Sequence, residues 1–434
     1  MLPIALALAL QAPVDLPQTA PEPAQSEPPA QAGELDLPSG ARVLFTIDGK
    51  GLEEEHIDHL GQGLAALDDV NGDGTPDFLT GSVSGVPGLS QGRGFAEVRS
   101  GKDGAVLLRV DGLDRPTDQA FGGDGFGIRV GRIPDVDGDG VGEFFVGGEP
   151  GLDPPYLKVY SGRSAQVLRT FTSDAGELEG LRDPSELRPI GDVDGEGQED
   201  FALVCRSQTC LLAGGSWKRL GVLDGEAVGR SADLDRDGAR DFFCRFDDWQ
   251  SSAGCSAGIV SSRDGRRLAR TKLPKAGLVR NWSWAATGDA NGDGFLDAAF
   301  LFFDSQRSSQ TWPAKEQRFR AQIVSGKDAT VLREWWEELE AVGDLGDVRF
   351  VGDFDGDGCD ELAIGHSVGR GSVTILSGKD GQHLARFAAP GWSFGVRVAR
   401  LGDLDGDGRG ELAIGEHEHG RCAGRVWVVS IAAR

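Results

Sequence analysis

The stretch DVDGDGVGE, residues 135–143, places four carboxylates and three glycines within nine residues. The acids stand at the first, third, fifth and ninth positions, so they can converge on one cation while glycine lets the backbone turn sharply. For a single copy, the alternative is a solvated Asp-Gly turn. The rest of the chain decides between these two interpretations.

The same spacing recurs six more times along the chain. The further copies are DVNGDGTPD (69–77), DVDGEGQED (192–200), DLDRDGARD (233–241), DANGDGFLD (289–297), DFDGDGCDE (353–361) and DLDGDGRGE (403–411). Successive first positions are 41 to 66 residues apart. Seven copies at such spacing indicate a degenerate structural repeat with connections of variable length.

Each acidic stretch lies between two short segments that are typical of β-strands. Alternating segments such as FGIRVGRIPD (126–135) precede it, and apolar runs such as EFFVGG (143–148) follow it. A second hairpin comes next, as in YLKVYSGRSAQVLRTF (156–171) and SVTILSGKDGQHLARF (372–387). We therefore expect four antiparallel strands per repeat, with the acidic loop between the first and the second.

Seven four-stranded units predict an all-β fold, a seven-bladed β-propeller, because radial closure leaves only short, protected sheet edges. The last repeat ends in GRVWVVSIAAR (424–434), which supplies a third strand and no fourth. The segment ARVLFTIDGKG (41–51) reads as a fourth strand without a blade of its own. Residues 42–47 should therefore complete the seventh blade, and the propeller should span residues 41–434.

Composition and charge agree with this interpretation. The 434 residues include 66 glycines and one methionine, which suits short strands joined by turns. The net charge is −25, but 26 of the 69 acidic residues stand at the repeated loop positions. Seven divalent cations would add +14 and leave −11. Nothing resembles a basic stripe, so nucleic acid is not an expected partner.

The N-terminal residues suggest export. Residues 1–12, MLPIALALALQA, form a short apolar run like the core of a signal peptide. A signal peptide usually has basic residues before this core, and here there are none, which would be explained if translation began upstream. The alternative is a hydrophobic tail. Residues 13–40 are rich in Pro, Ala, Gln and Glu and predict a disordered linker. No later segment is apolar enough to span a membrane. We expect a secreted, periplasmic or cell-surface monomer.

Six cysteines fit an exported protein with some disulfides. Cys205 and Cys210 flank a short turn, as do Cys244 and Cys255, and each pair could bridge neighbouring strands. Pairing of Cys359 with Cys422 is not expected, since one lies inside an acidic loop and the other precedes the final strand. The alternative is six buried thiols.

The repeat resembles the FG-GAP (VCBS-type) repeat, the unit of the integrin α-chain N-terminal propeller and of many exported bacterial proteins. The resemblance rests on the D-x-D-x-D-G-x-x-D loops and on the literal FG at Phe126-Gly127 and Phe394-Gly395. FG is lost in most other repeats, and GAP never appears intact. The resemblance implies calcium in the loops on one face of the propeller and ligands on the opposite face.

Up to seven calcium ions are predicted, one per loop, because calcium takes six to eight oxygen ligands and alternate loop positions point inward. The first, third, fifth and ninth residues would donate side-chain oxygen and the seventh its carbonyl. The ligand sets are Asp69, Asn71, Asp73, Thr75 and Asp77; Asp135, Asp137, Asp139, Val141 and Glu143; Asp192, Asp194, Glu196, Gln198 and Asp200; Asp233, Asp235, Asp237, Ala239 and Asp241; Asp289, Asn291, Asp293, Phe295 and Asp297; Asp353, Asp355, Asp357, Cys359 and Glu361; and Asp403, Asp405, Asp407, Arg409 and Glu411.

The seven loops should differ in strength. Asn71 and Asn291 lower the site charge, Glu196 lengthens the fifth position, and Arg236 replaces glycine at the fourth. We expect the third and fourth sites to be weakest. An EF-hand is excluded because the closing acid comes at position nine and strands flank the loop. The ions should be structural, since no general base stands nearby.

The face opposite the acidic loops offers two weaker signals. His417, His419, His56 and His59 could form an imidazole-rich site for zinc, nickel or copper, although the sequence favours four solvated histidines. Trp249, Trp312 and Trp392 fall in loops and could hold a sugar or peptide, whereas Trp282, Trp284, Trp335 and Trp427 fall in strands and should fill gaps between blades.

No nucleophile elbow, zinc-protease helix, phosphate loop or dinucleotide fingerprint is present in the sequence. We therefore predict a non-catalytic, calcium-binding propeller for adhesion or for binding an extracellular protein or glycan. The alternative is a carbohydrate-active enzyme of the polysaccharide-lyase kind. That function needs a basic cluster and a base in the cleft, and the Arg and Lys residues map mostly to the fourth strands and their turns.

Overall fold

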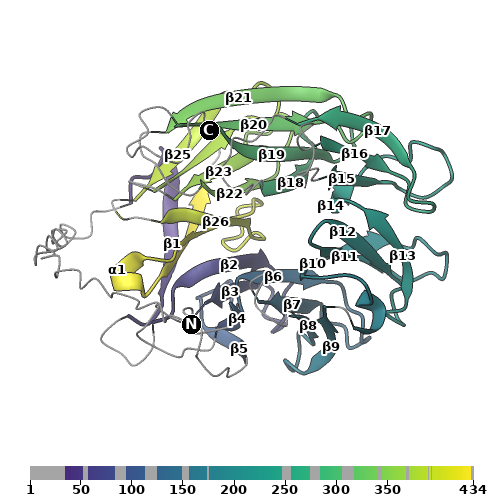
Figure 1. The fold of residues 1–434 in the computed structure, drawn as a ribbon. Helices are drawn as coiled ribbons and strands as arrows, with labels where there is room; N and C mark the ends of the chain where they lie inside the picture. The colour runs from purple at the N-terminus through teal and green to yellow at the C-terminus, as the bar shows by residue number, and fades with distance from the viewer. Residues whose placement is uncertain are drawn as a thin grey trace, which may run out of the picture. The chain divides into compact units, whose positions relative to one another are not determined.

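Seven four-stranded antiparallel sheets make up the described part of the chain. The computed structural model describes residues 35–51, 57–83, 94–112, 125–148, 156–173, 175–246, 256–273, 284–304, 317–339, 345–367, 371–389, 391 and 393–431. The sheets follow one another in a ring, with almost no helix among these residues. The fold is an all-β, seven-bladed β-propeller, as the repeat predicted (Figure 1).

Each of the first six blades consists of four consecutive strands, ordered from the inside of the ring outwards. The blades comprise β2 (Leu60–Ala66), β3 (Phe78–Ser82), β4 (Phe95–Arg99) and β5 (Val106–Asp111); β6 (Arg129–Ile133), β7 (Glu143–Gly147), β8 (Tyr156–Tyr160) and β9 (Val167–Thr172); β10 (Pro184–Gly191), β11 (Asp200–Cys205), β12 (Gln208–Leu212) and β13 (Arg219–Asp224); β14 (Glu226–Arg230), β15 (Phe242–Phe246), β16 (Ser256–Val260) and β17 (Arg267–Lys272); β18 (Trp284–Gly288), β19 (Asp297–Asp304), β20 (Gln317–Val324) and β21 (Val331–Leu339); and β22 (Leu345–Phe350), β23 (Leu362–His366), β24 (Ser372–Leu376) and β25 (His383–Ala388).

The seventh blade combines both ends of the described chain. It contains β26 (Phe394–Arg400), β27 (Leu412–Glu416), β28 (Arg425–Ile431) and, as its outer strand, β1 (Ala41–Asp48). β1 pairs antiparallel with β28, in a register from Ala41 opposite Ile431 to Asp48 opposite Arg425. Figure 1 shows β1 in purple beside the yellow C-terminal strands. The predicted closure by residues 42–47 is confirmed.

The core is divided among the junctions between blades. Seven clusters of buried hydrophobic residues each draw their members from two adjacent blades, including the junction of the seventh blade with the first. This arrangement follows from strands that are buried on both faces, as in β3, β7 and β24. Trp335 and Trp427 pack against two of these clusters, as the sequence predicted.

A recurrent five-residue turn joins the third and fourth strands. Its fifth N–H donates to the carbonyl of the first residue, for example Gly104 to Ser100 at 2.8 Å and Gly381 to Ser377 at 2.8 Å. The fifth residue adopts positive φ, which glycine tolerates best. Ala165 and Ala329 occupy this position with φ of 56° and 60°.

The described residues begin before the predicted start of the propeller at Ala41. Leu35 and Leu37 pack against the core cluster between the sixth and seventh blades, and Asp36 forms an antiparallel bridge with Ala388. Residues 35–40 of the predicted linker therefore lie against the propeller. Residues 1–34, with the predicted export signal, are outside the described residues.

Helix is confined in the described residues to the 3₁₀ turn η1 (Gly176–Leu178) and the short helix α1 (His419–Cys422). Neither has the length or apolar composition to cross a bilayer.

The described cysteines are free thiols. The expected bond between Cys205 and Cys210 is not formed, because Cys205 lies opposite Gln208 and Cys210 opposite Leu203 in the β11–β12 hairpin. Cys359 and Cys422 are likewise unpaired. Cys255 lies outside the described residues, so the proposed partner of Cys244 is not described.

Candidate metal centres

The first aspartate of each acidic loop accepts hydrogen bonds from the backbone of its own loop. In the second blade, Asp135 Oδ1 accepts from Gly138 N at 2.7 Å and Oδ2 from Gly140 N at 2.9 Å. Gly138 and Gly140 have φ of 79° and 86°, so the two glycines allow the left-handed turns that curl the chain around this carboxylate.

The fourth loop departs from this pattern at one residue. Arg236 occupies the fourth position with φ of 61°, where the other six loops have glycine. A non-glycine residue in the left-handed region costs about 1 kcal/mol. The expectation that the fourth loop is among the weaker cation sites stays a prediction.

The ninth residue closes every loop from a buried position. Its carboxylate accepts a hydrogen bond from the second residue's N–H in all seven loops, as in Val136 N to Glu143 Oε2 at 2.9 Å and Val193 N to Asp200 Oδ2 at 2.7 Å. Glu143 and Glu361 are 0% exposed. Each closing carboxylate is thus anchored beneath its loop, at the start of the blade's second strand.

The second oxygen of the ninth carboxylate has different surroundings in different loops. Asp77 Oδ1 accepts from Gly101 N at 3.1 Å and Asp297 Oδ1 from Gly326 N at 3.0 Å, so these oxygens bind the turn between the third and fourth strands. In Glu361 the second oxygen, Oε1, is buried and has no hydrogen-bond partner. A buried, unpartnered carboxylate oxygen is costly unless something positive faces it.

Five loops bring their carboxylates close together. Oxygens of the following groups lie within 4.8 Å of one another: Asp353, Asp355, Asp357 and Glu361; Asp403, Asp405, Asp407 and Glu411; Asp135, Asp137 and Glu143; Asp192, Asp194 and Asp200; and Asp233, Asp235 and Asp241. Only the sixth and seventh loops gather all four predicted carboxylates. These are the two candidate centres with the most complete oxygen sets.

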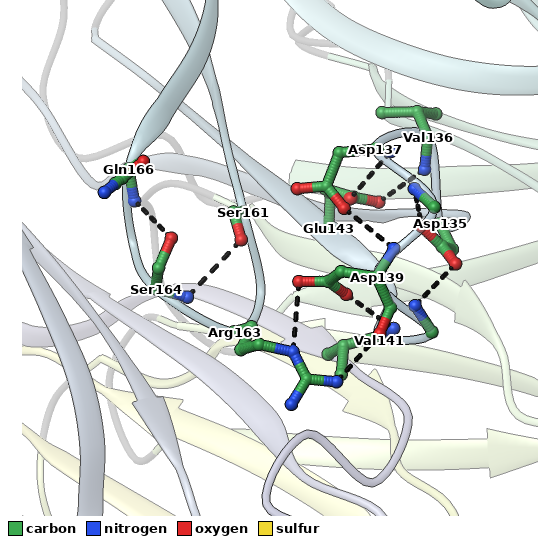
Figure 2. A network of polar contacts seen from close by, with 12 residues as sticks. Asp135, Val136, Asp137, Asp139, Val141, Glu143, Ser161, Arg163, Ser164 and Gln166 are labelled. Carbon is green, nitrogen blue, oxygen red and sulfur yellow. Dashed lines mark hydrogen bonds and ion pairs between the residues drawn. The ribbon is translucent and has the colours of Figure 1, made fainter.

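Basic side chains contact several of the fifth- and third-position acids. Arg163 Nε lies 3.2 Å from Asp139 Oδ2, and its Nη2 donates to the Asp139 carbonyl (Figure 2). Arg263 pairs with Asp237 at 3.3 Å in the fourth blade. Asp139 and Asp237 stand outside the carboxylate groups of their loops, whereas Asp357 of the sixth loop remains in its group although Lys379 Nζ lies 3.6 Å from its Oδ2.

The first and fifth loops keep the same fold without a complete acidic group. Asn71 replaces the third acid, and its Oδ1 accepts from Asp73 N at 2.9 Å. Asn291 accepts in the same way from Asp293 N at 2.9 Å. An amide oxygen remains a suitable ligand for a hard cation, although it brings no charge.

The seventh-position residues were predicted to offer their carbonyls. In six loops the structure places their N–H groups against the fifth-position carboxylate, as in Val141 to Asp139 at 2.8 Å and Cys359 to Asp357 at 3.0 Å. The carbonyl ligation by Thr75, Val141, Gln198, Ala239, Phe295, Cys359 and Arg409 stays a prediction.

Burial and mutual repulsion disfavour the ionised closing acids. Burial, reinforced by the neighbouring loop carboxylates, raises the pKa of Glu143, Glu361 and Glu411 to about 7. The pKa of Asp297 is raised to about 7 and that of Asp241 to about 6 for the same reasons. A bound cation would offset both costs, because it places positive charge where the carboxylates converge.

Solved structures of similar fold support the architecture. A crystal structure of BBS1N in complex with ARL6DN, soaked with mercury, matches at 10% identity with a TM-score of 0.52, covering 91% of this chain and 98% of that chain. Its lead-soaked counterpart gives 9% identity and a TM-score of 0.51 over the same shares. The V. cholerae biofilm matrix protein Bap1 matches at 12% identity with a TM-score of 0.49, covering 92% and 91%.

Only the two BBS1N structures, with TM-scores above 0.5, support the architecture, and they concern the propeller fold alone because their identities are far below 25%. No family model and no curated protein matches this sequence.

The histidines on the opposite face come together only in part. The rings of His59 and His417 lie 6.0 Å apart, with both Nδ1 atoms buried and unpartnered. His419 instead contacts Glu416, whose Oε2 lies 3.1 Å from His419 Nδ1 and accepts from Trp427 Nε1 at 2.9 Å. His56 is outside the described residues, and the described ones show no three-ligand group here.

The loop tryptophans cannot be placed. Trp249, Trp312 and Trp392, predicted for a ligand surface, lie outside the described residues, as does Trp282. Trp284 lies in β18, but its side chain is not described.

Sequence reasoning missed four arginines on innermost strands. Arg129, Arg188, Arg349 and Arg397 lie on β6, β10, β22 and β26, not on the outer strands where most basic residues were expected. A signal for them existed: each stands four or six residues before the first aspartate of its loop. We call these four residues the central arginine cluster.

Proposed function

We propose that this chain is an exported propeller of the FG-GAP (VCBS) type that binds calcium in its acidic loops. We propose further that it serves as a non-catalytic adhesion or ligand-binding module for an extracellular protein or glycan. The observation that carries the metal proposal is the sixth loop, where four carboxylates converge and a buried Glu361 oxygen has no partner.

Calcium suits these loops better than other common cations. The donors are carboxylate and amide oxygens, without imidazole or thiolate in the described groups, and such sets favour hard cations. Magnesium demands a small, nearly octahedral site and keeps several waters, whereas calcium accepts more oxygens in flexible geometry. The site charge differs among loops, so the ions should bind with graded affinity.

Calorimetric titration of the metal-free protein tests this proposal. Calcium should bind at several sites, and magnesium should bind more weakly. Glu361→Gln and Glu411→Gln should each remove or weaken one of the tightest sites. Asp111→Asn, which changes an exposed acid on β5 remote from any loop, is the matched control. A titration without calcium binding would reject the proposal.

The proposed role in binding rests on the resemblance of the repeat to the FG-GAP unit. BBS1N, a propeller of similar fold, is described in complex with ARL6DN, so a partner protein is compatible with this architecture. Protein and glycan arrays probed with and without calcium should reveal a ligand. An ultraviolet assay for unsaturated products from uronic polysaccharides distinguishes the alternative, because turnover would end the non-catalytic interpretation.

Export is part of the same proposal. Residues 1–12 would be removed as a signal, and residues 13–34 would link the mature N-terminus to the propeller. Intact-mass measurement of the protein recovered outside the producing cell tests this. A species that retains residues 1–12 would contradict cleavage.

A further inference from the structure

The seven first strands form the inner wall of the propeller. Contacts connect β2 to β6, β6 to β10, β10 to β14, β14 to β18, β18 to β22, β22 to β26, and β26 back to β2, so the wall is closed. Residues at equivalent positions of these strands therefore lie at similar levels around the centre of the ring. Figure 1 shows these strands on the inside of their blades.

Charged residues occupy equivalent positions on four of these strands. Arg129 and Arg397 stand six residues before the first aspartate of their loops, and Arg188 and Arg349 stand four before. Positions four and six share one side of a strand because side chains alternate. The central arginine cluster thus comes from the second, third, sixth and seventh blades.

Two carboxylates partly compensate these arginines. Arg188 pairs with Glu186 at 2.7 Å, and Arg349 Nε lies 3.3 Å from Asp347 Oδ2. Asp347 is fully buried and also accepts from the backbone N–H groups of Val348 and Val398. Arg188 and Arg349 thus each have a carboxylate partner, in a protein whose net charge is −25.

Arg129 is the unpaired member of the cluster. Its Nε is buried and has no hydrogen-bond partner, and no ion pair of its guanidinium is found among the described residues. The side chains of Arg188 and Arg349 are 23% and 37% exposed. The cluster therefore combines unused donors with access to solvent.

The charges act on one another across the ring. The positive charges of Arg188, Arg349 and Arg129 outweigh desolvation and lower the pKa of Glu186, although Arg349 comes from the sixth blade and Glu186 from the third. Burial, with Arg349 and Arg129 nearby, lowers the pKa of Arg397 to about 10 despite the favourable charge of Asp347. Burial, then the charges of His59 and Arg397, lowers the pKa of His417 to about 4, so the histidine pair borders the cluster.

We infer that the central arginine cluster is a binding site for an oxyanion group, a sulfate or a carboxylate, presented by a ligand at the centre of the propeller. The planar guanidinium fork matches these groups with two parallel hydrogen bonds. An anion would relieve the repulsion among the arginines and occupy the donors of Arg129. The site is separate from the acidic loops and does not depend on metal binding there.

Calorimetric titration of the full chain, kept in excess calcium, tests the inference. The probes are sodium sulfate and sodium succinate, with sodium chloride at equal ionic strength as the blank. Both or either should bind. Arg129→Gln should weaken binding about tenfold, because it removes a charge-assisted contact. That substitution breaks no ion pair, so the fold should persist, which circular dichroism checks.

Two further variants sharpen the result. Arg132→Gln, on the same strand and paired with Asp68 at 2.9 Å, is the matched control and should leave anion affinity unchanged. Glu186→Gln removes a competing carboxylate and should tighten binding several-fold. The inference would be overturned if the wild type, Arg129→Gln and Glu186→Gln bound the anions with equal affinity. It would also be overturned if sodium chloride gave the same binding heat as sulfate and succinate.

The metal proposal and this inference fail in different experiments. Glu361→Gln should alter calcium binding and leave the sulfate and succinate titrations unchanged. A sharp probe preference identifies the group, since sulfate-only binding points to a sulfated ligand and succinate-only binding to a carboxylated one.

Discussion

At the scale of single residues, backbone conformation explains why glycine recurs and where its absence costs stability. The fifth residue of the turn between the third and fourth strands has positive φ, whether it is Gly104 at 75° or Ala165 at 56°. Only glycine adopts this region without strain from a Cβ atom.

Ala165→Gly should therefore stabilise the protein by about 1 kcal/mol, since glycine relieves the left-handed strain. Gly104→Ala, the reverse change at the same turn position, should destabilise it by a similar amount. Denaturant unfolding in calcium measures both. Destabilisation by Ala165→Gly would show that the turn is not strained.

A half-buried histidine makes stability sensitive to acid. Burial, aided by the charge of Arg386, lowers the pKa of His366 to about 4. The unfolded chain binds this proton below about pH 6.5, but the folded chain does so only near pH 4, so stability falls as pH drops through that interval.

His366→Leu should reduce the slope of the unfolding free energy against pH between pH 4 and 6.5. The reduction corresponds to at most about one proton, or ~1.4 kcal/mol per pH unit. His383→Leu, at an exposed histidine on the outer strand β25 of the same blade, is the control and should keep the wild-type slope. Comparing the variants cancels the contribution of the acidic loops. Equal slopes for His366→Leu and wild type would refute the assignment.

At the scale of elements, the turn between the third and fourth strands shapes the neighbouring acidic loop. Its second residue is glycine in five blades because the loop backbone approaches closely: a Cβ at Gly162 would lie 2.0 Å from the Gly142 carbonyl oxygen, and one at Gly326 would lie 1.8 Å from that of Leu296. The fourth blade has Ser262 there, and its N–H reaches Asp241 only at 3.4 Å. Loop and turn thus form one unit.

The basic residue in this turn should tune metal affinity. In Arg163→Gln, Asp139 loses its ion pair and could then join Asp135, Asp137 and Glu143 as a ligand. The loop also loses a nearby positive charge that repels a cation. Calcium binding to the second blade should tighten several-fold, measured by competition with a chelating dye. Arg169→Gln, in the same blade but paired with Glu177, should have no such effect. Unchanged affinity in Arg163→Gln would mean that Asp139 is not a ligand.

Much of this unit could be predicted from the sequence, because the loop residues are contiguous and their spacing alone positions them. The hydrogen bonding of the second oxygen at position nine could not be predicted. It depends on whether the turn between the third and fourth strands reaches that oxygen, as it does for Asp77 and not for Glu361. The missing bond between Cys205 and Cys210 depended on register, which a two-residue turn does not reveal. The central arginine cluster depended on the superposition of four distant strands.

At the scale of the whole molecule, stability rests on closing the ring. Ile47 of β1 is 6% exposed and belongs to the cluster that joins the seventh blade to the first, together with Leu60, Phe78 and Val426. The repeat pattern predicted this closure because the last repeat has three strands and the N-terminal segment supplies the missing fourth. The packing of Leu35 and Leu37 was missed, since two leucines in a proline-rich segment carry no periodicity.

Ile47→Ala should destabilise the whole propeller by about 2–4 kcal/mol through the cavity that it leaves at the closing junction. Leu220→Ala, at an outer-strand residue that is 39% exposed, should cost less than about 0.5 kcal/mol. Denaturant unfolding measures both. Equal effects would show that the junction contributes no more than the surface.

We propose that cations bound in the acidic loops stabilise the folded propeller. Two sites saturated a hundredfold above Kd contribute about 5 kcal/mol together, or very roughly 5–10 °C in Tm for a chain of this size. Calorimetric melting in excess calcium and after EDTA treatment measures this directly. We predict that chelation lowers Tm by at least that amount and that added calcium restores it; an unchanged Tm after complete calcium removal would contradict the claim.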